Sequence, residues 1–213
     1  MTAVGPSAPA QSPTVLTLAA EASSGLLLRT LGAHRTAVSR LPPRPVASRL
    51  GLVVDDRHQI QRQATFLRFL SVTEAFAAET LLRHAEQAVL PSSHAIVRQI
   101  WAKAATSAIS RWVDQEAAYK SWLAVTAADV NWKPMHQLAE GRNAISHGLG
   151  HLTRQQQRDA DSVKAKLSAV GVPLIAGRVV LDEVVLANAA SQCRTFIAQI
   201  DVAVQRWVAC TAP

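Results

Sequence analysis

The sequence predicts a mostly α-helical bundle, and three observations support this fold class. Long stretches of good helix formers after residue 58 carry apolar residues every three or four positions, which is the spacing of one helix face. Gly and Pro, which end helices, fall mainly between these stretches. Apolar residues make up 49% of the 213 residues, which is enough for the core of one medium-sized domain.

Residues 1–55 differ in composition from the rest of the chain. They contain prolines at positions 6, 9, 13, 42, 43 and 45, among many Ala, Ser and Arg residues. This composition is typical of a flexible arm, although residues 16–31 also suit one short helix. We therefore expect a flexible, Pro/Ala/Arg-rich N-terminal arm over 1–55 and one helical domain over 56–213. A contact of the arm with RNA and the absence of any role both stay open.

The first helices of this domain follow from the places where Gly and Pro stop each apolar pattern. Residues 59–89 are expected to form a long helix that ends before the next proline, and residues 92–122 to form a second. Pro134 suits the first turn of a third helix, which we expect to end at Gly148 or Gly150.

The C-terminal part predicts two more helices and a pair of strands. Residues 153–170 form a polar, amphipathic pattern that should stop at the glycine that follows. The stretch VPLIAGRVVL (172–181) contains two short β-prone runs around Ala176 and Gly177, which predicts a small hairpin. Residues 182–208 then close the chain as a long helix with one apolar stripe.

The chain is basic, with 22 Lys and Arg against 15 Asp and Glu, a net charge of +7 and a pI of about 10.2. Such a surplus attracts polyanions, so RNA is an expected partner. Cys193 and Cys210 fall on one predicted helix, about 25 Å apart, which is too far for a disulfide and favours a reducing cytoplasm. No stretch has the length and apolarity of a membrane span or the pattern of a signal peptide, so no membrane contact is expected.

Two ionisable residues stand on apolar helix faces, where core residues are expected. Glu74 lies on the apolar seam of the first long helix, and Arg142 lies on that of the third, between Leu138 and Ile145. A lone buried charge costs several kcal/mol, so we expect Glu74 and Arg142 to pair between the two helices. Such a pair fits a functional site and also fits a structural role in fixing helix register.

The stretch EGRNAISHGLGH (140–151) holds the densest chemistry in the chain. On one helix Asn143 and His147 lie one above the other, with His136 on nearly the same line, while Arg142 lies about 140° from His147. Histidine transfers protons at neutral pH, and the arginine fork binds phosphate oxygens. RNA supplies its own nucleophile, the 2′-OH, so these residue types suit RNA cleavage without a metal. The alternative is a surface His and Asn in the last turn of an ordinary core helix.

The same stretch resembles the R-N-x-x-x-H strip of the HEPN superfamily, helical proteins that include many bacterial RNases of toxin–antitoxin and phage-defence systems. RNAISHG (142–148) matches the strip, and TEAFAAETLL (73–82) resembles the acidic element of the first helix in the RiboL-PSP branch. The HGLGH exit, a short hairpin and a final helix such as CRTFIAQID (193–201) follow in the same order. The resemblance covers about residues 58–205.

The resemblance implies a HEPN-like helical bundle in which Arg142 and His147 are catalytic, Asn143 positions them and Glu74 holds Arg142. It also implies a homodimer whose two strips face one cleft. Enzymes of this family cleave RNA without a metal or other cofactor and leave a 2′,3′-cyclic phosphate and a 5′-OH. We therefore expect a cytoplasmic endoribonuclease, a toxin or phage-defence effector, with a cognate antitoxin or defence partner.

Four further residues are expected to support this site. His136 and Ser146 lie beside the strip on the same helix, and Arg154 and Arg158 follow it in the chain. The two arginines are candidates for contacts to RNA, although their helix also fits an ordinary solvated face.

A metal site and a base-stacking surface are two other functions that histidines and tryptophans of this chain could provide. His147 and His151 have a metal-ligand spacing, but two glycines separate them and no H-E-x-x-H pattern is present, so no metal site is expected. Trp101 and Trp112 share a helix face that is expected to be core rather than a stacking surface. Three alternatives stay open: a non-catalytic HEPN-like module that binds a partner protein or nucleotide, a toxin controlled by a partner nucleotidyltransferase, and a plain helical scaffold.

Overall fold

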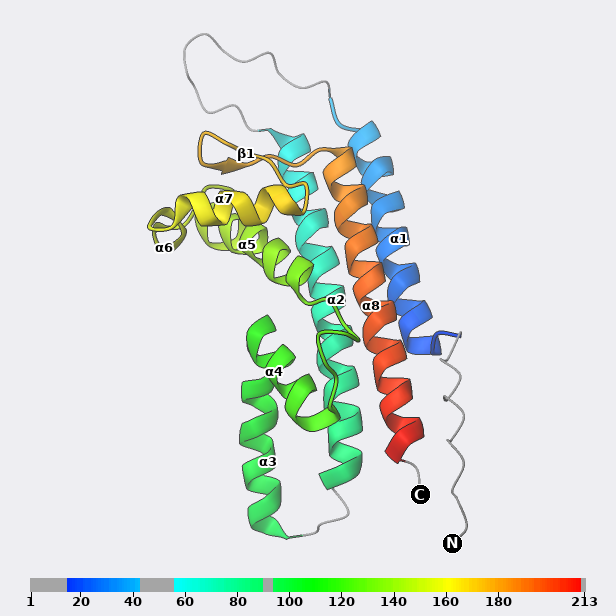
Figure 1. Ribbon diagram of the computed structural model, residues 1–213. Helices are drawn as coiled ribbons and strands as arrows, with labels where there is room; N and C mark the ends of the chain where they lie inside the picture. The colour runs from blue at the N-terminus through cyan, green and yellow to red at the C-terminus, as the bar shows by residue number, and fades with distance from the viewer. Residues whose placement is uncertain (1–14, 43–55, 90–93, 212–213) are drawn as a thin grey trace, which may run out of the picture.

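The computed structural model describes residues 15–42, 56–89 and 94–211. The long axis of the molecule is formed by three helices that lie side by side (Figure 1): α1 (Leu18–Ser39), α2 (Arg57–Val89) and α8 (Glu183–Thr211). The other helices and a two-stranded hairpin lie to one side of them. This confirms the predicted mostly α-helical bundle with a small hairpin before the last helix.

Helix α1 lies inside the segment that was expected to be a flexible arm, and it is part of the core. Ala20 and Leu27 are fully buried against α2 and α8. The backbone N–H of Thr17 donates to Oδ2 of Asp201 in α8 at 2.8 Å, and the Thr17 hydroxyl donates to Oδ1 at 2.5 Å. The helical domain therefore extends upstream of residue 56. The rest of the expected arm, residues 1–14 and 43–55, lies outside the described residues.

Helix α2 is central because other helices cover it from two sides. Helices α1 and α8 cover one side, and α4 (Trp112–Leu123) and α5 (Lys133–Gly148) contact the other. Its bounds confirm the first long helix predicted for the domain. Phe66, Phe69 and Leu70 are among its buried side chains, so the apolar seam seen in the sequence is its core face.

The predicted second long helix is broken into two: α3 (Ala95–Ala108) and α4 (Trp112–Leu123). The backbone of Arg111 is extended, and its guanidinium makes two hydrogen bonds to the carboxylate of Asp114, which also accepts from the Ser110 hydroxyl. These contacts fix a sharp turn where the sequence contains neither Gly nor Pro. The prediction of one continuous helix was wrong, because the residues around this turn favour helix and the apolar spacing continues across it.

The turn also separates the two tryptophans that were expected to share a core face. Trp112 is buried and packs against Trp132 and Phe196, with ring centroids 6.4 and 5.6 Å away. Trp101 is only partly buried and packs against Trp122 at 5.3 Å. The core role is therefore confirmed for Trp112, whereas Trp101 lies at the molecular surface.

The third predicted helix is α5 (Lys133–Gly148), which begins around Pro134 as expected. It ends in an unusual way, because the next residue, Leu149, has a φ of 53° and is 84% exposed. A left-handed backbone is uncommon for a residue other than glycine. Within the described part of the chain, the exposed Leu149 side chain makes no core contact that would offset the backbone strain. The expected end of the helix at Gly148 is confirmed.

The helix predicted over residues 153–170 is divided into α6 (Arg154–Gln157) and α7 (Ala160–Ala169) at Asp159, which has a non-helical backbone. A capping box between Thr153 and Gln156 starts α6. The hairpin follows with β1 (Leu174–Ile175) paired antiparallel to β2 (Arg178–Val179). Its turn is made by Ala176 and Gly177, whose φ values of 48° and 73° fit a tight hairpin turn.

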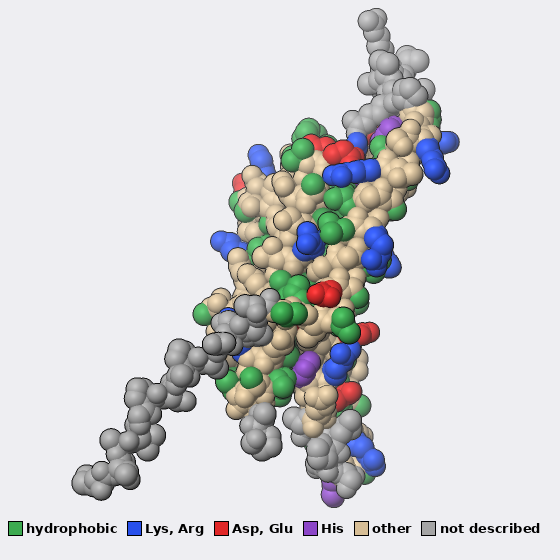
Figure 2. Space-filling view, turned by 90° about the vertical axis from the view of Figure 1, so that its right-hand side faces the viewer, with side chains coloured by type: hydrophobic (Ala, Val, Ile, Leu, Met, Phe, Trp, Pro, Cys, Tyr) green, Lys and Arg blue, Asp and Glu red, His purple; other side chains and the backbone are tan. Residues whose placement is uncertain are grey.

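No described helix is long and apolar enough to cross a lipid bilayer. On the face turned to the viewer in Figure 2, Lys and Arg side chains are scattered among neutral and apolar ones rather than gathered in one patch. The Lys and Arg side chains therefore form no continuous basic patch on this face.

The two cysteines lie in different environments on α8. Cys193 is fully buried, and burial raises the pKa of its thiol from 9.0 to about 12, partly offset by a hydrogen bond with Thr73. Cys210 is exposed, and both thiols are free. Because the unfolded chain releases the Cys193 proton near pH 9, this group lowers stability as the pH rises from 9 toward 12 and has no such effect at lower pH.

We expect Asp201→Ala to lower the free energy of unfolding by about 2 kcal/mol, because the charged acceptor of the Thr17 amide is lost. Chemical denaturation followed by circular dichroism measures this change. The matched control Asp161→Ala, on the exposed side of α7, should leave stability nearly unchanged. Equal stability of the two variants would contradict a bundle in which α1 depends on this contact.

Iodoacetamide at pH 8 should modify Cys210 and leave Cys193 intact in the folded protein, because only an accessible thiolate reacts. Intact-mass spectrometry counts the modified thiols. A Cys210→Ser variant should take up label only after unfolding in denaturant. Rapid modification of Cys193 in the folded state would show that this part of α8 opens readily.

Candidate functional site

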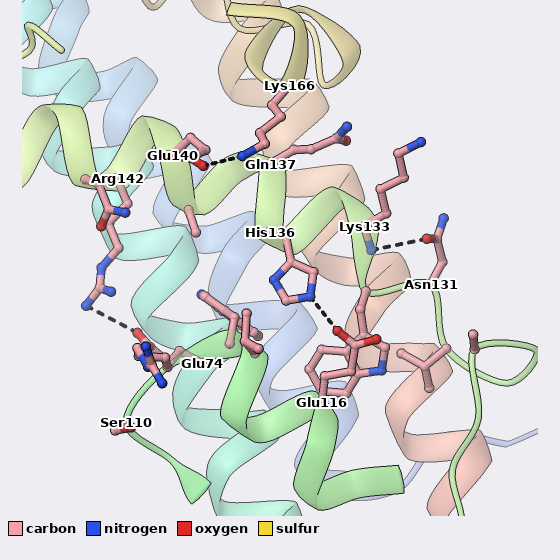
Figure 3. Close-up of a pocket in the computed structure, with 18 residues that line it drawn as sticks. Glu74, Ser110, Glu116, Asn131, Lys133, His136, Gln137, Glu140, Arg142 and Lys166 are labelled. Atoms are coloured by element: carbon pink, nitrogen blue, oxygen red, sulfur yellow. Dashed lines mark hydrogen bonds and ion pairs between the residues drawn. The ribbon is translucent and has the colours of Figure 1, made fainter. Parts of the chain in front are cut away.

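A cleft of about 720 Å³ opens between α2, α4 and α5, with the end of α7 at its edge (Figure 3). Its polar lining comes from four helices and the turns that precede α4 and α5. The lining residues that carry charge, imidazole or amide groups are Glu74, Arg111, Glu116, Asn131, Lys133, His136, Gln137, Glu140, Arg142, Asn143 and Lys166.

Helix α5 forms one wall of the cleft because its opposite face is anchored in the core. Leu138 is fully buried, and Ile145 is nearly so. Gly141 allows a close approach to α2, since a Cβ added there would lie 3.2 Å from Cζ of Phe66. His136 and Asn143, on the other face of the helix, line the cleft.

Two ion pairs and one histidine–carboxylate hydrogen bond join α5 to three different helices around the cleft (Figure 3). His136 Nε2 lies 2.6 Å from Glu116 Oε2 of α4, and Glu140 Oε1 lies 2.9 Å from Lys166 Nζ of α7. Arg142 Nη2 lies 3.4 Å from Glu74 Oε2 of α2. A carboxylate therefore lies beside each of His136, Arg142 and Lys166, and the cleft contains both basic and acidic side chains.

The predicted contact between Glu74 and Arg142 is confirmed, but the pair is not buried in the core. The side chain of Arg142 is 40% exposed and that of Glu74 is 20% exposed. Both residues line the cleft, which opens over α2 where α4 and α5 diverge. The apolar seams correctly predicted that Glu74 and Arg142 lie on the inner faces of their helices. These faces border an open cleft at this point instead of packed core side chains.

The cleft brings together Arg142, Asn143 and His136 but not His147. His147 and Ser146 are exposed on the last turn of α5 and do not line the cleft. Because residues 142–147 are regular helix, Arg142 and His147 are separated by about 7.5 Å along the axis and ~140° around it. One chain therefore does not direct both side chains to the same point.

Arg154 and Arg158 are exposed at the two ends of α6, outside the cleft. Helix α6 is nevertheless fixed beside α5, because Gln156 Nε2 donates to the backbone carbonyl and to the carboxylate of Glu140, each at 2.9 Å. The two arginines therefore stand near the strip, and their contact with RNA stays a prediction.

Glu116 is a site residue that the sequence did not indicate. It lies 20 residues before His136, on a different helix, in a region predicted to be one continuous helix. Only the turn at Arg111 directs α4 toward α5. Glu116 precedes two small alanines on α4 in the sequence, and no motif singles it out.

Among the described residues, no group of three or more His, Cys, Asp and Glu side chains is arranged to hold a metal ion. The helical spacing of His147 and His151 does not exist in the fold, because α5 ends at Gly148. Comparisons with protein-family models, curated proteins and solved structures found no match to this chain.

We expect Glu74→Gln to lower the free energy of unfolding by no more than about 1 kcal/mol, because solvent screens a pair with this exposure. Denaturant titration measures the change against Glu79→Gln, an exposed glutamate on the same helix that should have no effect. A loss of several kcal/mol would instead indicate the fully buried pair expected from the sequence.

Proposed function

We propose that the protein is a metal-independent endoribonuclease of HEPN type that acts in the cytoplasm as a toxin or defence effector. The observation that carries the proposal is the ion pair between Arg142 and Glu74, at the head of the R-N-x-x-x-H strip. It supports the proposal because it connects the two sequence elements on which the resemblance rests. Such a pair orients a guanidinium whose remaining N–H groups stay available for a phosphate.

The strip provides the groups that cleavage by the 2′-OH requires. A histidine takes or gives a proton, and Arg142 stabilises the charge on the crowded phosphorane. Asn143, which is half-buried at the cleft, can orient the substrate. Attack of the 2′-oxygen on phosphorus breaks the bond to the 5′-oxygen, which leaves a 2′,3′-cyclic phosphate and a 5′-OH.

A second copy of the chain would complete this arrangement, since His147 lies outside its own cleft. The exposed side chains of Ser146, His147 and Leu149 form the end of α5 that a second copy would cover. Leu149 supports this proposal, because it is a large apolar side chain held exposed by a left-handed backbone. We therefore propose a homodimer in which each strip faces the cleft of the partner, with RNA as the substrate and an antitoxin or defence protein as a further partner.

One observation favours the non-catalytic alternative, a module that binds a partner protein or a nucleotide. A cleft of about 720 Å³ has the size of small-ligand pockets, and its mixture of paired charges and amide groups suits a nucleotide. Control by a partner nucleotidyltransferase rests on the family resemblance only. RNA cleavage assays separate these alternatives.

We expect the purified protein to cleave end-labelled tRNA or mRNA in EDTA and to leave a cyclic phosphate. His147→Ala and Arg142→Ala should each lower the rate by about 10²-fold or more, since one proton-transfer residue or one oxyanion donor contributes that much. His151→Ala, an exposed histidine just beyond α5, is the matched control. A folded dimer that leaves every RNA intact would overturn the enzyme in favour of the binding module.

A further inference from the structure

The hydrogen bond between His136 and Glu116, at 2.6 Å, is the shortest polar contact between helices at the cleft, and the proposed function gives it no role. The two side chains are 30% and 40% exposed, and both line the cleft that contains Arg142 (Figure 3). His136 comes from α5 and Glu116 from α4, so the imidazole is held between the two helices that border the opening.

We propose that His136 is the general base of the RNA cleavage and that Glu116 is its positioning residue. This inference rests on the proposed function. It deepens that function by dividing the two proton transfers between two histidines, so that His136 takes the proton of the 2′-OH and His147 gives one to the leaving oxygen.

The hydrogen bond to Glu116 determines which nitrogen of His136 can act as a base. An ionised carboxylate only accepts, so the hydrogen of the neutral ring lies on Nε2, and Nδ1 keeps its lone pair. Nδ1 has no hydrogen-bond partner among the described residues, whereas Nε2 lies 2.6 Å from Oε2 of Glu116. A carboxylate in this position fixes the tautomer of a catalytic histidine and stabilises the imidazolium that forms, as in Ser-His-Asp triads.

A purely structural role accounts poorly for this pair. Ion pairs with this exposure contribute about 0–1 kcal/mol to stability. The start of α5 is already anchored to α4, because the ring of Trp132 packs 5.4 Å from Tyr119 and 6.4 Å from Trp112, centroid to centroid. Helices α4 and α5 therefore do not depend on His136 for their contact.

The surroundings of His136 fit the substrate of this reaction. Lys133 from α5 and Lys166 from α7 line the same cleft and attract phosphate, and Lys166 is held there by its ion pair with Glu140. Arg142 lies six residues along the helix, about 9 Å farther along the axis. Its guanidinium, paired with Glu74, lines the same cleft. Because His136 and Arg142 both line this cleft, we infer that a ribose bound at His136 has its 3′-phosphate on the side of Arg142.

The step balances within the cleft. The 2′-OH gives its proton to Nδ1 of His136, and the 2′-oxygen forms a bond to phosphorus. The bond from phosphorus to the 5′-oxygen breaks, and that oxygen takes a proton from the imidazolium of His147, supplied by the second copy. The products are a 2′,3′-cyclic phosphate and a 5′-OH, and water later returns the two histidines to their starting states.

The test compares His136→Ala, His136→Gln and Glu116→Gln with wild type on an RNA that contains one cleavage site. We expect both His136 variants to lower kcat by about 10²-fold or more with little change in KM. Added imidazole should restore part of the rate of His136→Ala, whereas a structural defect would not respond. Glu116→Gln should cause a smaller loss, and His94→Ala, an exposed histidine outside the cleft, should have no effect.

A second substrate, with sulfur at the leaving position, distinguishes the general base from the general acid. When sulfur replaces the 5′-bridging oxygen, the thiolate leaves without a proton, so a variant that lacks the general acid recovers. We expect His147→Ala to recover on this substrate and His136→Ala to stay slow. Recovery of His136→Ala would overturn its assignment as the base.

The remaining outcomes separate the two proposals. If wild type cleaves RNA and His136→Ala, with an unchanged circular dichroism spectrum, cleaves at the same rate, the inference is wrong and the proposed function stands. If His136→Ala does not fold, His136→Gln gives the same comparison, since its amide can still donate to Glu116. No cleavage by folded wild-type dimer overturns both proposals.

Discussion

The close approach of α5 to α2 at Gly141 is the constraint on which the cleft depends. A Cβ at this position would lie 3.2 Å from Cζ of Phe66, so the ring or the helix would have to shift by a few tenths of an ångström. With glycine there, Arg142 comes within reach of Glu74, and the rest of α5 lies between α4 and α7. Apolar packing thus supplies the stability, and the ion pairs set the orientation of side chains that contribute little to stability themselves.

The distribution of charge distinguishes this cleft from a simple basic groove. Lys166, Arg142 and His136 each stand beside a carboxylate, so a phosphate that enters must compete with three acidic groups. The chain as a whole carries +7. On the face shown in Figure 2, the visible Lys and Arg side chains lie apart from one another. Long-range attraction of an anion and its local positioning are therefore separate tasks, and salt weakens the first more than the second.

Most helices and the hairpin could be predicted from the sequence, because Gly, Pro and apolar spacing mark their ends locally. The contact of Glu74 with Arg142 was also predictable, since two opposite charges on core faces need partners. Burial of α1 was underestimated because the prolines on both sides of it outweighed its short apolar stripe. Glu116 could not be predicted, because its position depends on the turn at Arg111, which side-chain hydrogen bonds make rather than a helix-breaking residue.

The hydrogen bonds between Thr17 and Asp201 span 184 residues of the chain, and this separation has a consequence for synthesis. At about 5–20 residues per second, roughly 10–40 s pass between translation of Thr17, the N-cap of α1, and of Asp201, which accepts its hydrogen bonds. During this interval Leu27 and Leu31 have no α8 to cover them, although α2 is already available. The growing chain therefore exposes an apolar helix face that chaperones can bind, and the three-helix core forms only after α8 is translated.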